Sequence, residues 1–171
     1  MEVSIEAALA LEETKHFLAT ARRFCTLIEE GTKTDVDFLL QLQVELLNLY
    51  QSALALPYIS LTPREEQSKP VSKGTSEEII NSISKRLGAN RFYWDIFDPT
   101  TDDDLEPGAG DLLDDVGDIY QDLKYNLATY SVGTLVNMES ALWEAKFGFE
   151  KHWGQHAVGA IRTIHFLLTK N

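Results

Sequence analysis

Two groups of side chains in the C-terminal half of the chain have the residue types and the spacing to bind a metal ion. The first group is a row of aspartates at intervals of four, three and four residues, namely Asp111, Asp115, Asp118 and Asp122. On a helix, these intervals place the four carboxylates within about 60° of one another on one face. Because like charges at this spacing repel, the row needs solvent, cations or a partner beside it.

Three interpretations of this acidic face are open. Its carboxylates could hold a hard divalent cation, since Mg²⁺ and Mn²⁺ prefer oxygen ligands. They could instead dock a partner rich in arginine or lysine. The third interpretation is a solvated face, because aspartates in a first helical turn suit the positive end of the helix dipole. Asp118 and Asp122 lie too deep in the expected helix for the dipole to account for them.

The second group is a histidine pair. His152 and His156 are four residues apart, so on a helix both rings point the same way and could share Zn²⁺ or Ni²⁺. A facing helix in a bundle commonly adds a carboxylate, so the candidate metal ligands are Asp115, Asp118, Asp122, His152 and His156. The alternative is that the histidines only hydrogen-bond a carboxylate or a carbonyl. The zincin pattern is absent, since Trp153 stands where that motif has its glutamate.

The elements that must position these residues are helices. Apolar residues recur at helical spacing over about 4–30, 34–56, 75–87, 111–130 and 135–168. We therefore expect an all-α fold, an antiparallel helical bundle of four longer helices plus one short helix, with residues 1–171 as a single domain. Residues 61–74 and 100–110 are predicted to be loops. The aromatic segment 90–99 could be a short strand or an extended segment laid over the bundle, and we favour the second because no partner strand is visible.

Local signals refine these boundaries. Gly31 is a natural helix stop, Thr34 precedes the second helix, and Thr75 with Glu78 forms a capping box for the third. Three glycines lie within the last helix at Gly148, Gly154 and Gly159. Because glycine lowers helix propensity, these positions predict the close approach of another backbone.

Charge and cysteine content argue against several classes of protein. A formal net charge of −12 disfavours nucleic acid as a partner, because that affinity rests on Lys and Arg, and disfavours an acidic membrane surface. The N-terminus lacks the basic region of a signal peptide, and no apolar run reaches membrane-spanning length. Cys25 is the single cysteine, which suits a reducing compartment and a packing role. We expect a soluble cytoplasmic protein.

Large aromatic side chains concentrate in the C-terminal half, including all three tryptophans of the chain. Such rings either fill a core or form a patch for a partner protein. The interaction surface that we predict joins the acidic face to two of the tryptophans: Asp111, Asp115, Asp118, Asp122, Trp94 and Trp143. Its partner would be another protein or a second copy of the chain.

Three sequence blocks occur in order across residues 92–169: Tyr93–Pro99, Asp114–Leu123, and Ala141–Trp143 followed by Phe147, Phe149 and Trp153-Gly154. In order and spacing they resemble an uncharacterised bacterial family, the domain of unknown function DUF5063. The N-terminal helices are similar to that family in their hydrophobic pattern and in the turn at residues 53–57. The resemblance implies a small bacterial all-helical protein without an assigned activity. It includes Trp153-Gly154 and excludes the two flanking histidines.

Two hypotheses for the function follow. The leading one is a non-enzymatic helical-bundle protein that acts through protein–protein contacts. The rival is a metal-dependent enzyme of the hydrolase type, with a carboxylate and histidine site between the fourth and fifth helices. No cofactor-binding motif is present, and a divalent metal is the one cofactor that these residues could hold. The enzyme hypothesis predicts that the aspartates and the histidines converge, whereas the contact hypothesis predicts that the aspartates stay outside.

Overall fold

The prediction of an all-α fold is confirmed by the computed structural model, which describes residues 2–30, 35–62, 77–96, 100 and 106–170. The α-helices are α1 (Ile5–Ala10), α2 (Glu12–Glu30), α3 (Asp35–Ala55), α4 (Glu77–Leu87), α5 (Leu112–Tyr130), α6 (Leu135–Gly148) and α7 (Gly154–Thr169). A 3₁₀ turn, η1 (Gly88–Arg91), and a π-helical turn, η2 (Phe149–Trp153), connect some of them. The short strands are β1 (Glu2–Val3), β2 (Tyr58–Ile59), β3 (Phe92–Asp95) and β4 (Gly108–Asp111).

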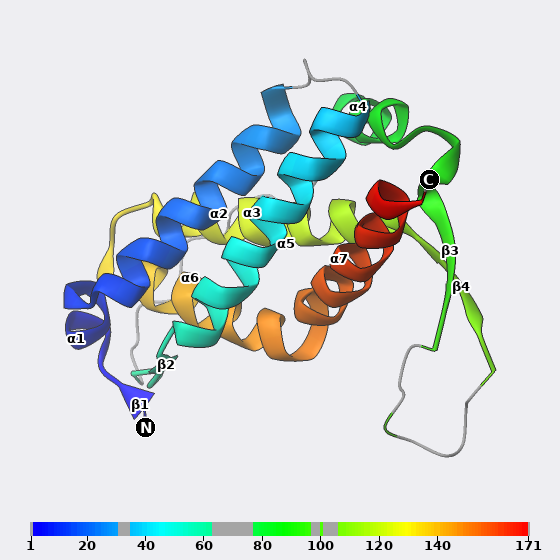
Figure 1. Cartoon of the computed structure of the whole chain (residues 1–171). Coiled ribbons are helices and arrows are strands. Elements are labelled where there is room, and N and C mark those ends of the chain that lie inside the picture. Colours follow the sequence, from blue (N-terminus) through cyan, green and yellow to red (C-terminus); the bar gives the residue numbers. More distant parts are fainter. Residues whose placement is uncertain (1, 31–34, 63–76, 97–99, 101–105, 171) are drawn as a thin grey trace.

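The helices pack around one apolar core. Helices α2 and α3 form an antiparallel pair, α5 crosses behind them, and α7 contacts both α3 and α5 (Figure 1). Side chains from α2, α3, α5 and α7 meet in this core, where Phe24, Leu46, Ile119 and Ile164 are all fully buried. The core therefore fixes α5 and α7 beside each other, which is what the candidate site requires.

The first helix is divided, in contrast to the single helix expected over 4–30. Ser4 caps α1 by accepting a hydrogen bond from the Ala7 N–H, and Leu11 adopts an extended conformation that separates α1 from α2. The break lets the preceding residues Glu2–Val3 pair in parallel with Tyr58–Ile59, so that the N-terminus is tied to the end of α3.

The last helix also differs from the continuous helix expected over 135–168. It changes direction at η2, between α6 and α7 (Figure 1). The Gly154 N–H donates to the Phe149 carbonyl five residues earlier, and a Cβ on Gly154 would lie only 2.1 Å from that oxygen. The close approach predicted for Gly154 is thus to the backbone of its own helix. Only glycine fits there, which accounts for the turn.

The favoured prediction for segment 90–99, an extended segment without a partner strand, is wrong, and the alternative of a short strand is confirmed for Phe92–Asp95. Strand β3 pairs antiparallel with β4, which begins inside the predicted loop 100–110 and ends at Asp111, and Tyr93 stands opposite Gly110. The Tyr93 ring covers Gly110, where a Cβ would lie 2.3 Å from the ring. A second close contact at Gly159 is with the Tyr93 hydroxyl, a side chain and not the backbone that we expected. The ribbon projects from the side of the bundle (Figure 1).

Two buried cationic side chains from other helices cap the C-terminal ends of α2 and α3. The Arg86 guanidinium donates to the carbonyls of Leu27 and Ile28 in the last turns of α2, at 3.1 and 2.6 Å. The Lys146 ammonium donates to the Ala53 and Leu54 carbonyls of α3 in the same way. Burial lowers the pKa of both groups. Each cation satisfies helix-terminal acceptors that would otherwise be buried without a donor.

Some predicted features lie outside the described residues, namely the helix stop at Gly31, the start at Thr34, the capping residue Thr75, and residues 63–74 and 101–105 of the two predicted loops. In the part of the chain that the structure describes, no helix combines the length and the apolar character needed to cross a membrane.

A candidate metal centre and the adjoining cavity

The four aspartates of the acidic face have different surroundings. Asp111 precedes α5 and caps it, because its carboxylate accepts from the Leu113 N–H, and it also pairs with Arg91 at 3.0 Å. Asp115 is buried, whereas Asp118 and Asp122 are partly exposed further along α5. Asp111 therefore has a structural role, and the other three aspartates face the histidines.

The two histidines come from either side of the junction between η2 and α7. His152 lies within the π turn and His156 lies in the first turn of α7, with ring centroids 5.0 Å apart. Each ring contacts a carboxylate of α5. His152 Nδ1 lies 2.9 Å from Asp122 Oδ2, and His156 Nδ1 lies 2.8 Å from Asp115 Oδ1. The structure thus brings together all five of the candidate metal ligands.

These contacts define which histidine nitrogens are free. An ionised carboxylate can only accept a hydrogen bond, so each Nδ1 carries the proton and donates it. In a neutral ring the other nitrogen, Nε2, then has a free lone pair. Ligand atoms of Asp118, His152 and His156 lie within 4.8 Å of one another, and His156 Nε2 is 3.6 Å from Asp118 Oδ2. Two histidine nitrogens and one carboxylate oxygen are therefore close neighbours.

The hydrogen bond that His156 donates to Asp115 also sets the acidity of the His156 ring. This hydrogen bond is the largest cause that raises the pKa of His156, burial opposes it, and the charges of Asp115, Asp118 and Asp122 reinforce it. A carboxylate bound to Nδ1 orients the ring and makes Nε2 a more basic ligand. Asp115 and Asp122 are therefore placed to orient the two histidines, while Asp118 is placed to be a ligand.

Tyr93 is a member of this network that the sequence analysis did not identify. Its hydroxyl donates to Asp115 Oδ2 at 2.7 Å, so Asp115 accepts from both Tyr93 and His156. Burial, followed by the hydrogen bond to Asp115, raises the pKa of Tyr93 well above its ordinary value, which keeps the hydroxyl protonated as a donor. The sequence feature that could have pointed to Tyr93 is the pair of glycines Gly110 and Gly159, which make room for its ring.

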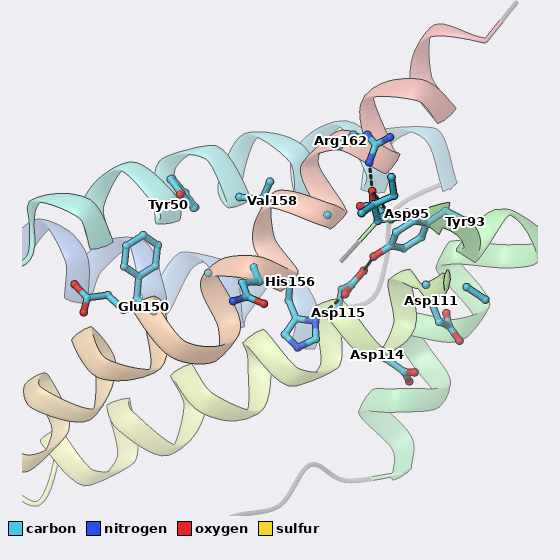
Figure 2. A pocket seen from close by; sticks show the side chains of 17 residues that line it. Tyr50, Tyr93, Asp95, Asp111, Asp114, Asp115, Glu150, His156, Val158 and Arg162 are labelled. Atoms are coloured by element: carbon cyan, nitrogen blue, oxygen red, sulfur yellow. Dashed lines mark hydrogen bonds and ion pairs between the residues drawn. The ribbon is translucent and has the colours of Figure 1, made fainter. Parts of the chain in front are cut away.

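A cavity of about 620 Å³ adjoins the network between the β3–β4 ribbon, α5, η2 and α7. Figure 2 shows Tyr93, Asp115 and His156 linked along one wall, with Asp95 and Arg162 paired at another. His156 and Asp115 line the cavity, whereas Asp118 and His152 do not. The candidate metal ligands thus lie beside the cavity, and His156 belongs to both the ligand cluster and the cavity wall.

The remaining predicted residues lie apart from this network. Trp94 is on the outward face of β3 and is 73% exposed. Trp143 is half-buried on α6 and stacks on Phe147, with ring centroids 5.0 Å apart. Cys25 is buried, and burial raises the pKa of its thiol to about 12. The predicted acidic and aromatic interaction surface is therefore not continuous, since Asp115 faces inward.

The fold and the site define the class of protein: it is a helical bundle that carries a cluster of histidines and aspartates beside a cavity. The chain belongs to the family described as a domain of unknown function, DUF5063, whose model matches residues 9–170. It is similar to the crystal structure of protein BF1032 from Bacteroides fragilis, with a TM-score of 0.79 and 21% identity over 96% of this chain and 97% of that one. No curated protein matches the sequence. At this identity the likeness supports the fold alone.

Proposed function

We propose that this chain binds a divalent transition-metal ion through Asp118 and the Nε2 atoms of His152 and His156. The observation that carries the proposal is the separation of 3.6 Å between His156 Nε2 and Asp118 Oδ2. Two ligand atoms bound to one ion at about 2.1 Å lie about 3.0–3.4 Å apart. Without a cation or a proton between them, the lone pairs of these two atoms would face each other unfavourably.

The surrounding carboxylates support a metal rather than an incidental contact. Each histidine already uses Nδ1 to contact an aspartate of α5, Asp115 for His156 and Asp122 for His152. Metal-binding histidines generally have such a partner on the second nitrogen, which fixes the ring and the tautomer. A mixture of imidazole and carboxylate ligands favours ions such as Zn²⁺, Ni²⁺ or Mn²⁺ over Mg²⁺.

The proposed chemistry is of the hydrolase type. With three protein ligands, an ion keeps at least one coordination position for water, and bound Zn²⁺ lowers the pKa of that water to about 7. The cluster is partly exposed, so a substrate could reach such a water. The free and buried Cys25 supports the cytoplasm as the location.

Thermal unfolding of metal-stripped protein tests the metal site. Each of Zn²⁺, Ni²⁺, Mn²⁺ and Mg²⁺ is added separately, and we expect Zn²⁺ or Ni²⁺ to raise Tm by several degrees. A ligand at a hundred times its dissociation constant adds about 2.7 kcal/mol. His156→Ala should abolish the shift, whereas His165→Ala, a matched change at an exposed position of the same helix, should preserve it.

The metal proposal fails if no ion raises Tm, or if the shift survives in both His152→Ala and His156→Ala. Circular dichroism of the metal-free variants separates loss of the site from loss of the fold. The hydrolytic step has its own test, which is zinc-dependent turnover of an activated ester such as p-nitrophenyl acetate. Turnover that Asp118→Asn leaves unchanged would reject the hydrolase chemistry and retain the metal site.

A role in protein contacts is a second proposal, supported by exposed apolar side chains. Val36, Leu40, Val44 and Leu47 recur at helical spacing on α3 and are each about half exposed or more. Phe92 and Trp94 are also exposed, on the outward face of β3. A partner protein or a second copy would bury one of these surfaces. The test is sedimentation velocity of the protein and of Leu40→Glu, where an unchanged monomer for both would exclude self-association.

A further inference from the structure

The cavity between the β3–β4 ribbon and the bundle has the size of a ligand-binding pocket. Its volume is about 620 Å³, and pockets for small molecules span about 300–1,000 Å³. Its walls combine five carboxylates with an apolar surface. The carboxylates belong to Asp95, Asp111, Asp114, Asp115 and Glu150.

The basic groups of the cavity are already engaged. Among the lining residues that the structure describes, only Arg162 and His156 can carry positive charge. Arg162 pairs with Asp95, and His156 hydrogen-bonds Asp115. An anionic ligand would have to separate one of these pairs and then face the remaining carboxylates.

At least one acidic group lacks a matching partner. Asp111 pairs with Arg91, and Glu150 accepts from the Tyr58 hydroxyl at 2.5 Å. The Asp114 carboxylate has neither a hydrogen bond nor an ion pair among the described residues. Burial, followed by the charges of neighbouring aspartates, raises its pKa, and the charge of Arg91 opposes this shift. The exposed Asp114 carboxylate therefore gives the cavity wall excess negative charge, which attracts a cation.

The rest of the wall suits an apolar body. Phe149 and Tyr50 meet edge to face with ring centroids 5.0 Å apart, and Val158 and Ile96 also line the cavity. In Figure 2, Tyr50 and Val158 lie on the side away from Asp114. An aromatic wall opposite a carboxylate is an arrangement that accommodates an ammonium group with an apolar substituent.

We propose that this cavity binds a small organic cation, an amine with an aromatic or aliphatic body, whose ammonium group lies towards Asp114 and whose body packs against Phe149 and Tyr50. Two of the proposed metal ligands, Asp118 and His152, do not line the cavity, and the third, His156, lies in the wall that the two sites share. Amine binding therefore requires no metal, and each proposal can fail without the other.

The experiment is isothermal titration calorimetry of metal-stripped protein with three probes that share an indole ring and differ in charge: tryptamine, tryptophol and indole-3-propionate. We expect tryptamine to bind at least about tenfold more tightly than tryptophol, because only tryptamine gains from the negative cavity. Indole-3-propionate should be the weakest of the three. Amide shifts at Gly110 and Gly159 in a ¹⁵N correlation spectrum should place tryptamine in the cavity.

A matched pair of variants removes one charge inside and one outside the cavity. Asp114→Asn should weaken tryptamine by about threefold to fivefold, the range of a partly exposed ion pair, and leave tryptophol unchanged. Glu144→Gln, an exposed acid of α6 outside the lining, should change neither. Equal affinity for the three probes, tighter binding of indole-3-propionate, or no binding of tryptamine would each overturn the proposal.

Discussion

Two helix pairs in this molecule are packed with opposite chemistry. Between α2 and α3 the buried side chains are apolar, and Phe24, Ile28 and Leu46 have no exposed surface. At the edge between α5 and the η2–α7 segment, aspartates face histidines at hydrogen-bonding distance. The two pairs share one core, so they differ in the side chains at the contact and not in the kind of element that carries them.

The difference separates what stabilises the fold from what could serve a function. Burial of a large apolar side chain contributes about 1.5–3 kcal/mol, whereas a paired polar group that is taken from water gains little or nothing. The α2–α3 contact is explained by stability alone. The aspartates and histidines that face each other at the edge of the contact between α5 and η2–α7 need another explanation, and the proposed metal ion supplies one.

The largest predicted effect concerns Cys25, which belongs to the apolar pair. Burial first, and the charge of Glu29 second, raise its pKa from 9.0 to about 12. Because the thiolate is the reactive form, we expect alkylation by iodoacetamide at pH 8 to be about a thousandfold slower in the native protein than in guanidinium chloride. Mass spectrometry of timed samples measures both rates. Rapid native labelling would show that this part of the core opens to solvent.

A second prediction compares the two helix pairs directly. Phe24→Ala should lower the free energy of unfolding by about 3–5 kcal/mol, because it removes a fully buried ring and leaves a cavity. The exposed Leu47 provides the control, and Leu47→Ala should stay within about 0.5 kcal/mol of the parent. Urea titration gives both values. The metal-induced shift should persist in Phe24→Ala, and its loss would mean that the two regions are coupled.

A third prediction concerns the π turn that carries His152. A Cβ at Gly154 would lie 2.1 Å from the Phe149 carbonyl, so Gly154→Ala must reorganise the turn, at a cost of about 1–3 kcal/mol. We expect the response to Zn²⁺ or Ni²⁺ to disappear with it, since His152 would move. Thermal unfolding with and without the ion measures both effects.

The matched control for this change is Gly117→Ala in the middle of α5, where a Cβ would meet only Ile80 at 3.4 Å. Alanine is a better helix former than glycine, so this variant should be neutral or up to about 1 kcal/mol more stable. It should also keep its metal response. If Gly154→Ala behaved in the same way, the π turn would have no part in the site.

Features that depend on residue spacing could be predicted from the sequence in both helix pairs. The apolar stripes of α2 and α3 repeat every three or four residues, so their helices and buried faces could be predicted from spacing. The spacing of Asp115, Asp118 and Asp122 likewise placed them on one face of α5, and the interval between His152 and His156 predicted that their rings would lie together. These features depend on periodicity, which is local.

Features that depend on contacts between distant segments could not be predicted in this way. Strand β4 contains Gly108-Ala109-Gly110, which has little strand propensity, and it forms because Tyr93 on β3 packs over Gly110. The role of Tyr93 as a donor to Asp115 depends on that pairing. Gly154 did signal a close approach, but only the structure shows that the π turn of its own helix causes it.

The smallest predicted effect is the titration of His156 in metal-free protein. Its pKa is raised above 6.5, chiefly by the hydrogen bond with Asp115, so the charged ring is favoured in the folded state. The stability from this interaction is fully present below about pH 6.5 and is lost as the pH rises through the raised pKa. Asp115→Asn should move the pKa of His156 down. Proton NMR of the imidazole signals, assigned by His156→Asn, measures the change.

The titration of His156 also bears on the proposed metal site. The proton that stabilises His156 occupies Nε2, the atom that a metal would bind, so acid and metal compete for one position. Metal affinity should therefore fall as the pH is lowered through the raised pKa, while the apolar α2–α3 contact is unaffected. Metal binding that is independent of pH across this range would remove His156 from the ligands and leave its contact with Asp115 as a purely structural one.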